Sequence, residues 1–150
     1  MKLLVDADAC PGPVKAILYK TSERLNLKVI LVANQNMRIP KSNLIELIIV
    51  SPGFNEADNH IVEITEPGDL IITSDIPLAE RIIRKHGLVL TPRGKILNEE
   101  NIGERIALRN LMEELRSGGI DSGGPSSFSQ KDKQEFSRQL DKLLTRQLKS

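Results

Sequence analysis

Two aspartates near the N-terminus are the first residues whose type and spacing suggest chemistry. Asp6 and Asp8 come directly after the apolar run Leu-Leu-Val at residues 3–5. An apolar run without polar alternation is typical of a strand buried on both faces of a sheet. If the chain is still extended at Asp8, both carboxylates point the same way and repel each other. A bound cation is then the expected partner, although a single Asp in this place is also a common helix N-cap.

Two further aspartates are expected near this pair. Asp75 ends a predicted strand at residues 69–75, and Asp58 lies in a predicted helix at residues 55–64. Each has a structural alternative, because Asp75 could cap the next helix and Asp58 could form a capping box with Asn55. Several carboxylates around one point favour a hard cation, Mg²⁺ or Mn²⁺. The candidate catalytic residues are Asp6, Asp8, Asp58 and Asp75, and the candidate metal ligands are Asp6, Asp8 and Asp75.

Polar and basic residues in the neighbouring loops would suit a phosphodiester substrate. They follow the second, fourth and fifth predicted strands, and one lies near the start of the last predicted helix. Basic groups around an acidic metal centre can neutralise phosphate oxygens. Solvated loop charges without a function look the same in a sequence. The candidate substrate-binding residues are Asn34, Arg38, Thr73, Ser74, Arg93 and Lys131.

The elements that must position these residues alternate between strands and helices. Apolar, often β-branched runs predict further strands at residues 28–33, 44–50, 69–75 and 88–91, after the first strand. Apolar residues spaced three or four apart predict helices from residue 13 to 25, at 55–64, from 78 to about 87, and from 98 to about 116. This pattern predicts a three-layer α/β fold with a mostly parallel five-stranded sheet in the order 3-2-1-4-5. In such a sheet, ligands bind at the carboxyl ends of the strands.

The chain is predicted to form a single domain over residues 1–150. Residues 1–116 would be the α/β core, 117–128 a loop rich in Gly and Ser, and 129–150 an added C-terminal helix. Ser129 and Asp132 form a predicted capping box at its start. An apolar stripe predicts packing on the same domain or on a second copy, through Phe136, Leu140, Leu143 and Leu144. The stripe consists of Phe136, Leu140, Leu143, Leu144 and Leu148.

Composition excludes several classes of function. A net charge of +1 gives no global field toward nucleic acid or membrane, and only 3% of the residues are aromatic, which argues against a base-stacking platform. The single cysteine, Cys10, excludes an internal disulfide and a zinc site built on cysteines, and a buried structural role is expected for it. Neither a signal peptide nor a membrane-spanning run is present in the sequence, so a cytoplasmic protein is expected.

Several motifs together resemble the bacterial YaiI/YqxD family across essentially the whole chain. They are Asp6-Ala-Asp-Ala-Cys-Pro11, Val32-Ala-Asn34, Gly53-Phe-Asn-Glu-Ala-Asp58, the stretch from Gly68 to Ala79, Pro92-Arg-Gly94, Ser122-Gly-Gly-Pro125 and Ser129-Gln-Lys-Asp132. That family is placed among PIN-like domains, a fold of metal-dependent ribonucleases. By this resemblance, Asp6, Asp58 and Asp75 match the acids of PIN domains. The chain differs in having Asp8 where Asn is common, and in lacking a second acid after the fourth strand.

The sequence therefore predicts a nuclease that uses Mg²⁺ or Mn²⁺ and hydrolyses a nucleic-acid phosphodiester, with RNA as the expected substrate. A homodimer is an additional expectation. Two other hypotheses stay open at this point. One is a phosphatase similar to the haloacid dehalogenases, with Asp6 as the nucleophile. The other is a non-catalytic PIN-like module that binds RNA or a protein partner.

Overall fold

A mixed six-stranded sheet forms the centre of the computed structural model, which describes residues 1–53, 55–119 and 127–149. The strand order is β3-β2-β1-β4-β5-β6, and all neighbouring strands are parallel except β5 and β6. The predicted α/β class and the order 3-2-1-4-5 of the first five strands are confirmed. The strands are β1 (Leu3–Asp6), β2 (Val29–Ala33), β3 (Ile45–Ile49), β4 (Leu70–Ile72), β5 (Leu88–Leu90) and β6 (Ile96–Leu97).

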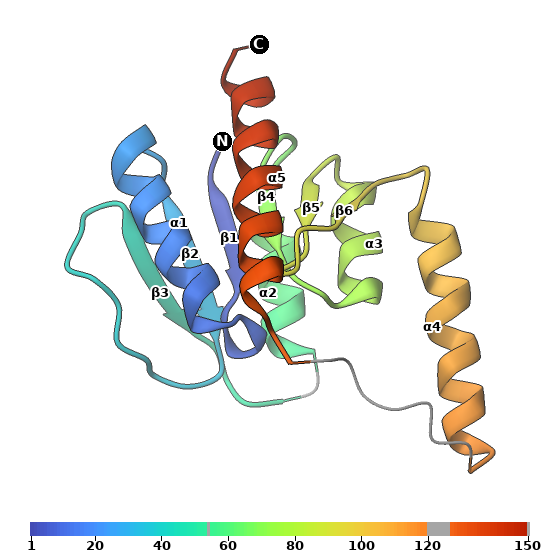
Figure 1. The fold of residues 1–150 in the computed structure, drawn as a ribbon. Helices are drawn as coiled ribbons and strands as arrows, with labels where there is room; N and C mark the ends of the chain where they lie inside the picture. Colours follow the sequence, from blue (N-terminus) through green and yellow to red (C-terminus); the bar gives the residue numbers. More distant parts are fainter. Residues whose placement is uncertain (54, 120–126, 150) are drawn as a thin grey trace.

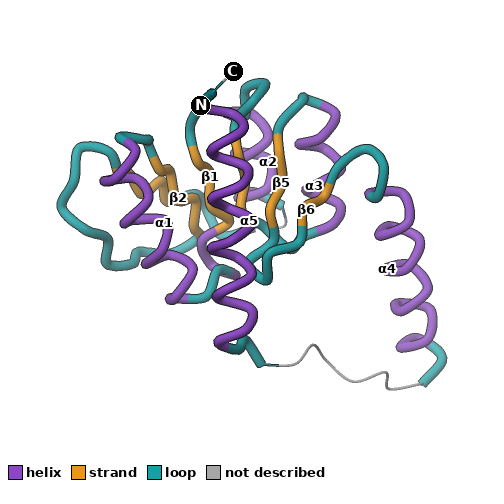
Figure 2. Tube along the Cα trace, turned by 45° about the horizontal axis from the view of Figure 1, so that its top comes forward, coloured by secondary structure: helices purple, strands orange, loops and turns teal. Residues whose placement is uncertain are grey.

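Helices cover both faces of this sheet, which gives three layers (Figures 1 and 2). Helices α1 (Gly12–Leu25) and α5 (Gln130–Leu148) share one buried cluster with Leu3 and Val5 of β1. Helices α2 (Glu56–Ile64) and α3 (Ile76–Arg84) share the other cluster with Leu4. Alternate residues of β1 therefore enter opposite layers, as the period of a strand requires. Asp6 is two residues after Leu4 in the strand, so its side chain lies on the same face of the sheet, toward α2 and α3.

The sixth strand was not predicted from the sequence. After β5 the chain turns at Gly94, whose φ of +87° is readily available only to glycine, and returns as the two-residue strand β6. A Cβ at Gly94 would also lie 2.7 Å from the backbone carbon of Glu135 in α5. A run of two apolar residues is too short to show a strand period, so only pairing with β5 reveals it.

The C-terminal helix α5 packs on its own domain. Phe136 and Leu140 are fully buried against the sheet, and Leu143 and Leu144 belong to the same cluster. The predicted capping box between Ser129 and Asp132 is present. The predicted packing through these four apolar residues is confirmed, and Leu148, the last residue of the stripe, is 47% exposed because the helix has passed the edge of the cluster there.

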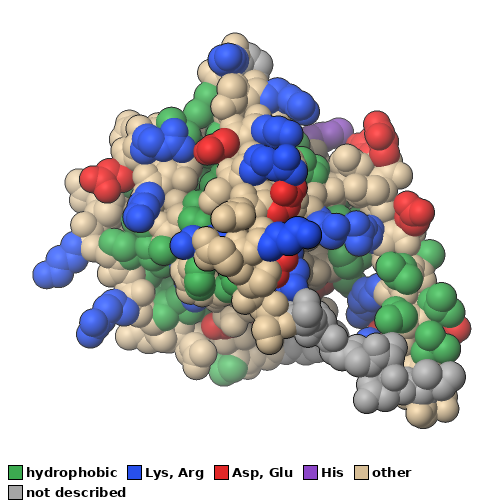
Figure 3. Space-filling model, in the orientation of Figure 1, with side chains coloured by type: hydrophobic (Ala, Val, Ile, Leu, Met, Phe, Trp, Pro, Cys, Tyr) green, Lys and Arg blue, Asp and Glu red, His purple; other side chains and the backbone are tan. Residues whose placement is uncertain are grey.

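Helix α4 (Ile102–Ser117) begins beside α3 and extends away from the sheet (Figure 1). Asn98 caps the turn in front of this helix, because its Oδ1 accepts from the N–H of Asn101 while the Oδ1 of Asn101 accepts from the N–H of Asn98, and the helix itself begins at Ile102. Leu108 and Leu111 are about half exposed, and hydrophobic side chains are visible over α4 in Figure 3. The homodimer stays a prediction.

Two further expectations concern the loop before α5 and the membrane. Residues 120–126 of the predicted 117–128 loop lie outside the described residues. In the part of the chain that the structure describes, no helix is long and apolar enough to cross a membrane.

Candidate functional site

Asp6 is the last residue of the central strand β1 and lies at the carboxyl edge of the sheet. Its side chain is half-buried, and its Oδ2 accepts a hydrogen bond of 3.0 Å from the hydroxyl of Thr73. Burial raises the pKa of Asp6, the Thr73 hydrogen bond opposes this rise, and the charges of Asp75 and Asp8 add to it. The charged form of Asp6 is therefore disfavoured unless a positive charge is near.

Thr73 and Asp75 follow the neighbouring strand β4. Thr73 is buried, and its hydroxyl donates to Asp6 while it accepts from the backbone N–H of Asp75 at 3.1 Å. Asp75 caps α3, because its Oδ1 accepts from the N–H of Leu78 at 3.0 Å. The capping alternative for Asp75 is thus confirmed, and the same carboxylate also faces Asp6 and Asp58 closely enough to perturb both. The predicted meeting of Asp6 and Asp75 at one sheet edge is confirmed.

Asp58 joins this pair from helix α2. The predicted capping box with Asn55 was wrong: Asn55 has a left-handed φ of 63° and makes no side-chain cap. Burial, the charges of Asp75 and Asp6, and a hydrogen bond to Asp75 raise the pKa of Asp58 to about 6, against the opposing effect of Arg81. A carboxyl group that shares a hydrogen bond with another carboxyl group is strongly coupled to it. We call Asp6, Asp58 and Asp75 the acid triad.

Asp8 takes a different position from the one expected for an extended chain. Residues Ala7–Ala9 form a 3₁₀ turn, so Asp8 does not continue the strand in which Asp6 ends. The Asp8 side chain is exposed, and its Oδ2 accepts from the backbone N–H of Asn34 at 2.7 Å. This bond joins the ends of β1 and β2. The charge of Asp8 still contributes to the raised pKa of Asp6.

The donor atoms of the acid triad decide which metal ion could fit there. Among the described residues, no three Asp, Glu, His or Cys side chains are already arranged to hold one. The acid triad nevertheless offers only carboxylate oxygens, which suit Mg²⁺ or Mn²⁺, and the charge of Asp75 disfavours the charged forms of Asp6 and Asp58. A divalent cation would remove that repulsion. Asp6, Asp58 and Asp75 are therefore the residues that could hold it, and the metal itself stays a prediction.

The predicted substrate-binding residues do not form one cluster. Arg93 pairs with Asp132 at 3.1 Å, which joins the β5–β6 turn to the start of α5. Arg38 and Lys131 are exposed, and Asn34 contributes its backbone to Asp8. Their roles stay predictions.

A cavity of about 420 Å³ adjoins the acid triad and was not predicted from the sequence. Ser74, next to Asp75 in the chain, lines it, as do Lys95 and Arg105, which the sequence reasoning missed. Lys95 directly follows the Pro92-Arg-Gly94 turn, and this position was the only feature of the sequence that could have indicated a binding role for it. Cys10 lies nearby but is buried, and burial raises the pKa of its thiol to about 12, so it is not an activated nucleophile.

Replacing Asp58 by Asn is expected to stabilise the metal-free protein at pH 7.5. Because the pKa of Asp58 is raised from 3.8 to about 6, the folded state holds this proton more tightly than the unfolded state. Stability from this group is present below about pH 4 and is lost as the pH rises through 6. Discounted for screening at a half-exposed side chain, the gain at pH 7.5 is roughly 1 kcal/mol.

Urea unfolding in EDTA at pH 4 and pH 7.5 measures this effect. Glu63→Gln, an exposed position on the same helix, is the matched control. Equal stabilities of the Asp58→Asn variant and the wild type at pH 7.5 would contradict the proposed coupling.

The fold and the site define a three-layer α/β protein with an acidic centre at the carboxyl edge of its sheet. The chain belongs to the family described as "Uncharacterized BCR, YaiI/YqxD family", whose model matches residues 4–146. The resemblance noted from the motifs is thereby confirmed for the family.

Curated relatives match over nearly their full lengths. A "UPF0178 protein" of Maridesulfovibrio salexigens is 56% identical over 99% of this chain and 98% of its own. A "UPF0178 protein" of Geobacter metallireducens is 51% identical over 97% and 94%, and one of Marinomonas sp. is 50% identical over 99% and 100%. No solved structure gives a significant match.

Proposed function

We propose that the protein is a nuclease that depends on a divalent metal ion and hydrolyses phosphodiester bonds in RNA. The observation that carries this proposal is the acid triad, in which Asp6 of β1 and Asp58 of α2 lie close enough to Asp75, the N-cap of α3, for its charge to disfavour their charged forms. Unpaired acids would repel a polyanionic substrate, and a cation reverses that effect. The resemblance to PIN-like domains supports the same reaction.

The residues of the chain have distinct roles in this proposal. Asp6 and Asp75 would hold Mg²⁺ or Mn²⁺, and Asp58 would complete the set or orient the attacking water. When bound, the metal supplies charge neutralisation and a more acidic water. Thr73 acts as a positioning residue, since its hydroxyl fixes the Asp6 carboxylate and accepts from the amide of Asp75. Asp8 supports the edge of the site through its bond to the amide of Asn34.

The position of Asp69 argues against the phosphatase hypothesis. That reaction would need an acid pair, and Asp69 would have to supply one member. Asp69 precedes β4, whereas Asp75 follows it, and Asp69 is buried in an ion pair with Lys2. Its carboxylate also accepts from the backbone N–H groups of Lys2 and Glu66. Asp69 is thus occupied at the opposite end of the strand.

Cleavage of an end-labelled single-stranded RNA oligomer by the purified protein tests the proposal. Shortened products are expected with Mn²⁺ or Mg²⁺ and not with EDTA. Absence of cleavage with either metal would contradict the nuclease. Hydrolysis of p-nitrophenyl phosphate alone would favour the phosphatase, and RNA binding without cleavage would favour the non-catalytic module.

A further inference from the structure

We infer that the cavity beside the acid triad is a binding site for one nucleotide, with the base at its aromatic end and the phosphate at its cationic end. This inference extends the proposed function, because the nucleotide would be part of the strand that is cut. The cavity, of about 420 Å³, lies in the range of volumes that small-molecule sites have.

Ser74 relates the cavity to the acid triad, because it lines the cavity and directly precedes Asp75 in the chain. Ala9 also lines the cavity and directly follows Asp8, at the same edge of the sheet. An RNA strand that presents a phosphodiester to the acids would therefore place its next nucleotide at the mouth of the cavity. None of the described residues that line the cavity is acidic.

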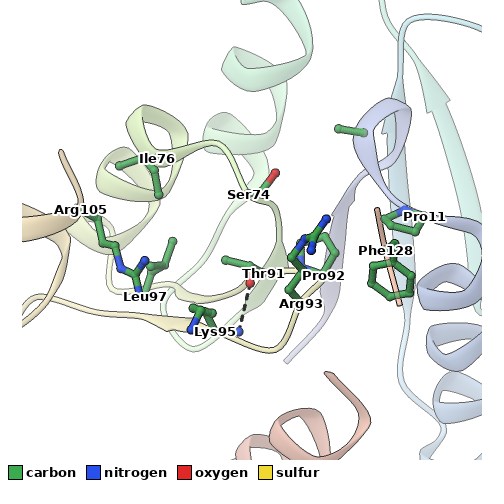
Figure 4. Close-up of a pocket in the computed structure, with 11 residues that line it drawn as sticks. Pro11, Ser74, Ile76, Thr91, Pro92, Arg93, Lys95, Leu97, Arg105 and Phe128 are labelled. Carbon is green, nitrogen blue, oxygen red and sulfur yellow. Dashed lines mark hydrogen bonds between the residues drawn. The ribbon is translucent and has the colours of Figure 1, made fainter. Parts of the chain in front are cut away.

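The two ends of the cavity differ in chemistry (Figure 4). Phe128 and Pro11 lie at one end, and Arg105 lies at the other, with Pro92 between them. Lys95 is on the side of Arg105. An aromatic ring suits a flat base, because stacking accepts every base, and a guanidinium suits a phosphate. A nucleoside monophosphate presents both groups in one molecule.

Lys95 and Arg105 form no ion pair within 4.0 Å among the described residues, although Asp132 and Glu135 line the adjoining hollow with them. Arg93, on the same cavity wall, pairs with Asp132. The ion pairs found between described residues include neither Lys95 nor Arg105. Two cations without a close ion pair, at the end of an apolar wall, are the strongest indication that the cavity receives an anion with an apolar part.

Calorimetric titration of the full chain with 5′-AMP in EDTA and 50 mM salt tests this site without requiring catalysis. Saturable binding is expected, and adenosine and inorganic phosphate should each bind more weakly than AMP. Arg105→Ala and Lys95→Ala should each weaken AMP binding by about tenfold through loss of a charged hydrogen bond. Phe128→Leu should weaken it by roughly tenfold through loss of stacking.

Arg109→Ala is the matched control, because it removes the same charge one turn along α4 at a position that does not line the cavity. Its AMP affinity should equal that of the wild type, and unfolding curves identify any variant that fails to fold. No AMP binding, or equal binding by wild type and Arg105→Ala, would overturn the nucleotide site. The AMP titration contains no metal, so it is independent of catalysis. AMP binding without RNA cleavage would refute only the proposed nuclease activity. RNA cleavage without AMP binding would refute only the nucleotide site in the cavity.

Discussion

Asp6→Asn is expected to reduce RNA cleavage in the presence of Mn²⁺ by about a hundredfold or more. The substitution keeps the shape of the side chain and its acceptor for Thr73, but it removes the charge that a metal ligand needs. A loss of several kcal/mol in transition-state stabilisation corresponds to such a factor. The rate of product formation from labelled RNA measures it.

Two comparisons separate this effect from a folding defect. Asp141→Asn makes the same chemical change on the outer face of α5, where the side chain is 66% exposed, and should leave the rate unchanged. The Asp6→Asn protein should be at least as stable as the wild type in EDTA, because repulsion from Asp75 and Asp8 is relieved. Full activity of a folded Asp6→Asn protein would contradict the assignment of Asp6 to the metal.

Phe136→Ala is expected to lower the free energy of unfolding by about 3–5 kcal/mol, the usual loss for a fully buried aromatic side chain. Phe136 is 0% exposed and joins α5 to the same cluster as Leu3 and Val5 of the central strand. The change leaves a cavity in the layer formed by α1 and α5. Urea unfolding measures the loss.

Lys142→Ala, on the exposed face of α5, is the control and should change stability little. A loss of less than 1 kcal/mol for Phe136→Ala would mean that α5 adds little to the core.

Much of the fold could be predicted because buried parallel strands have a clear sequence pattern. Residues 29–33 are apolar without interruption, and all five are buried on both faces of the sheet. The order of the strands then follows from right-handed crossovers. The strand β6 could not be predicted, because its two residues are defined by pairing with β5 and not by any period of their own.

The candidate site could be predicted in part for a similar reason. Asp6 ends β1 and Asp75 follows shortly after the adjacent strand β4, so strand order brings them together. Asp8 could not be placed, because a 3₁₀ turn replaces the extended chain after Asp6. The surroundings of Asp58 depend on how Asn55 starts α2, and its left-handed backbone is not visible in the residue pattern.

The cavity is the part of the site least accessible from the sequence. Its wall combines Pro11, Ser74, Lys95, Arg105 and Phe128, which come from five separate segments. Only the return of the chain at Gly94 and the docking of α5 bring these residues together. The number of residues between them in the sequence gives no indication that they meet in the fold.

Calorimetric titration of the wild-type chain with Mn²⁺ tests the central claim most directly, since it asks whether the acid triad holds a divalent cation. We expect saturable binding by the wild type and by Asp141→Asn, and a loss of binding in Asp6→Asn and in Asp75→Asn. No binding by the wild type, or equal binding by all four proteins, would contradict the account.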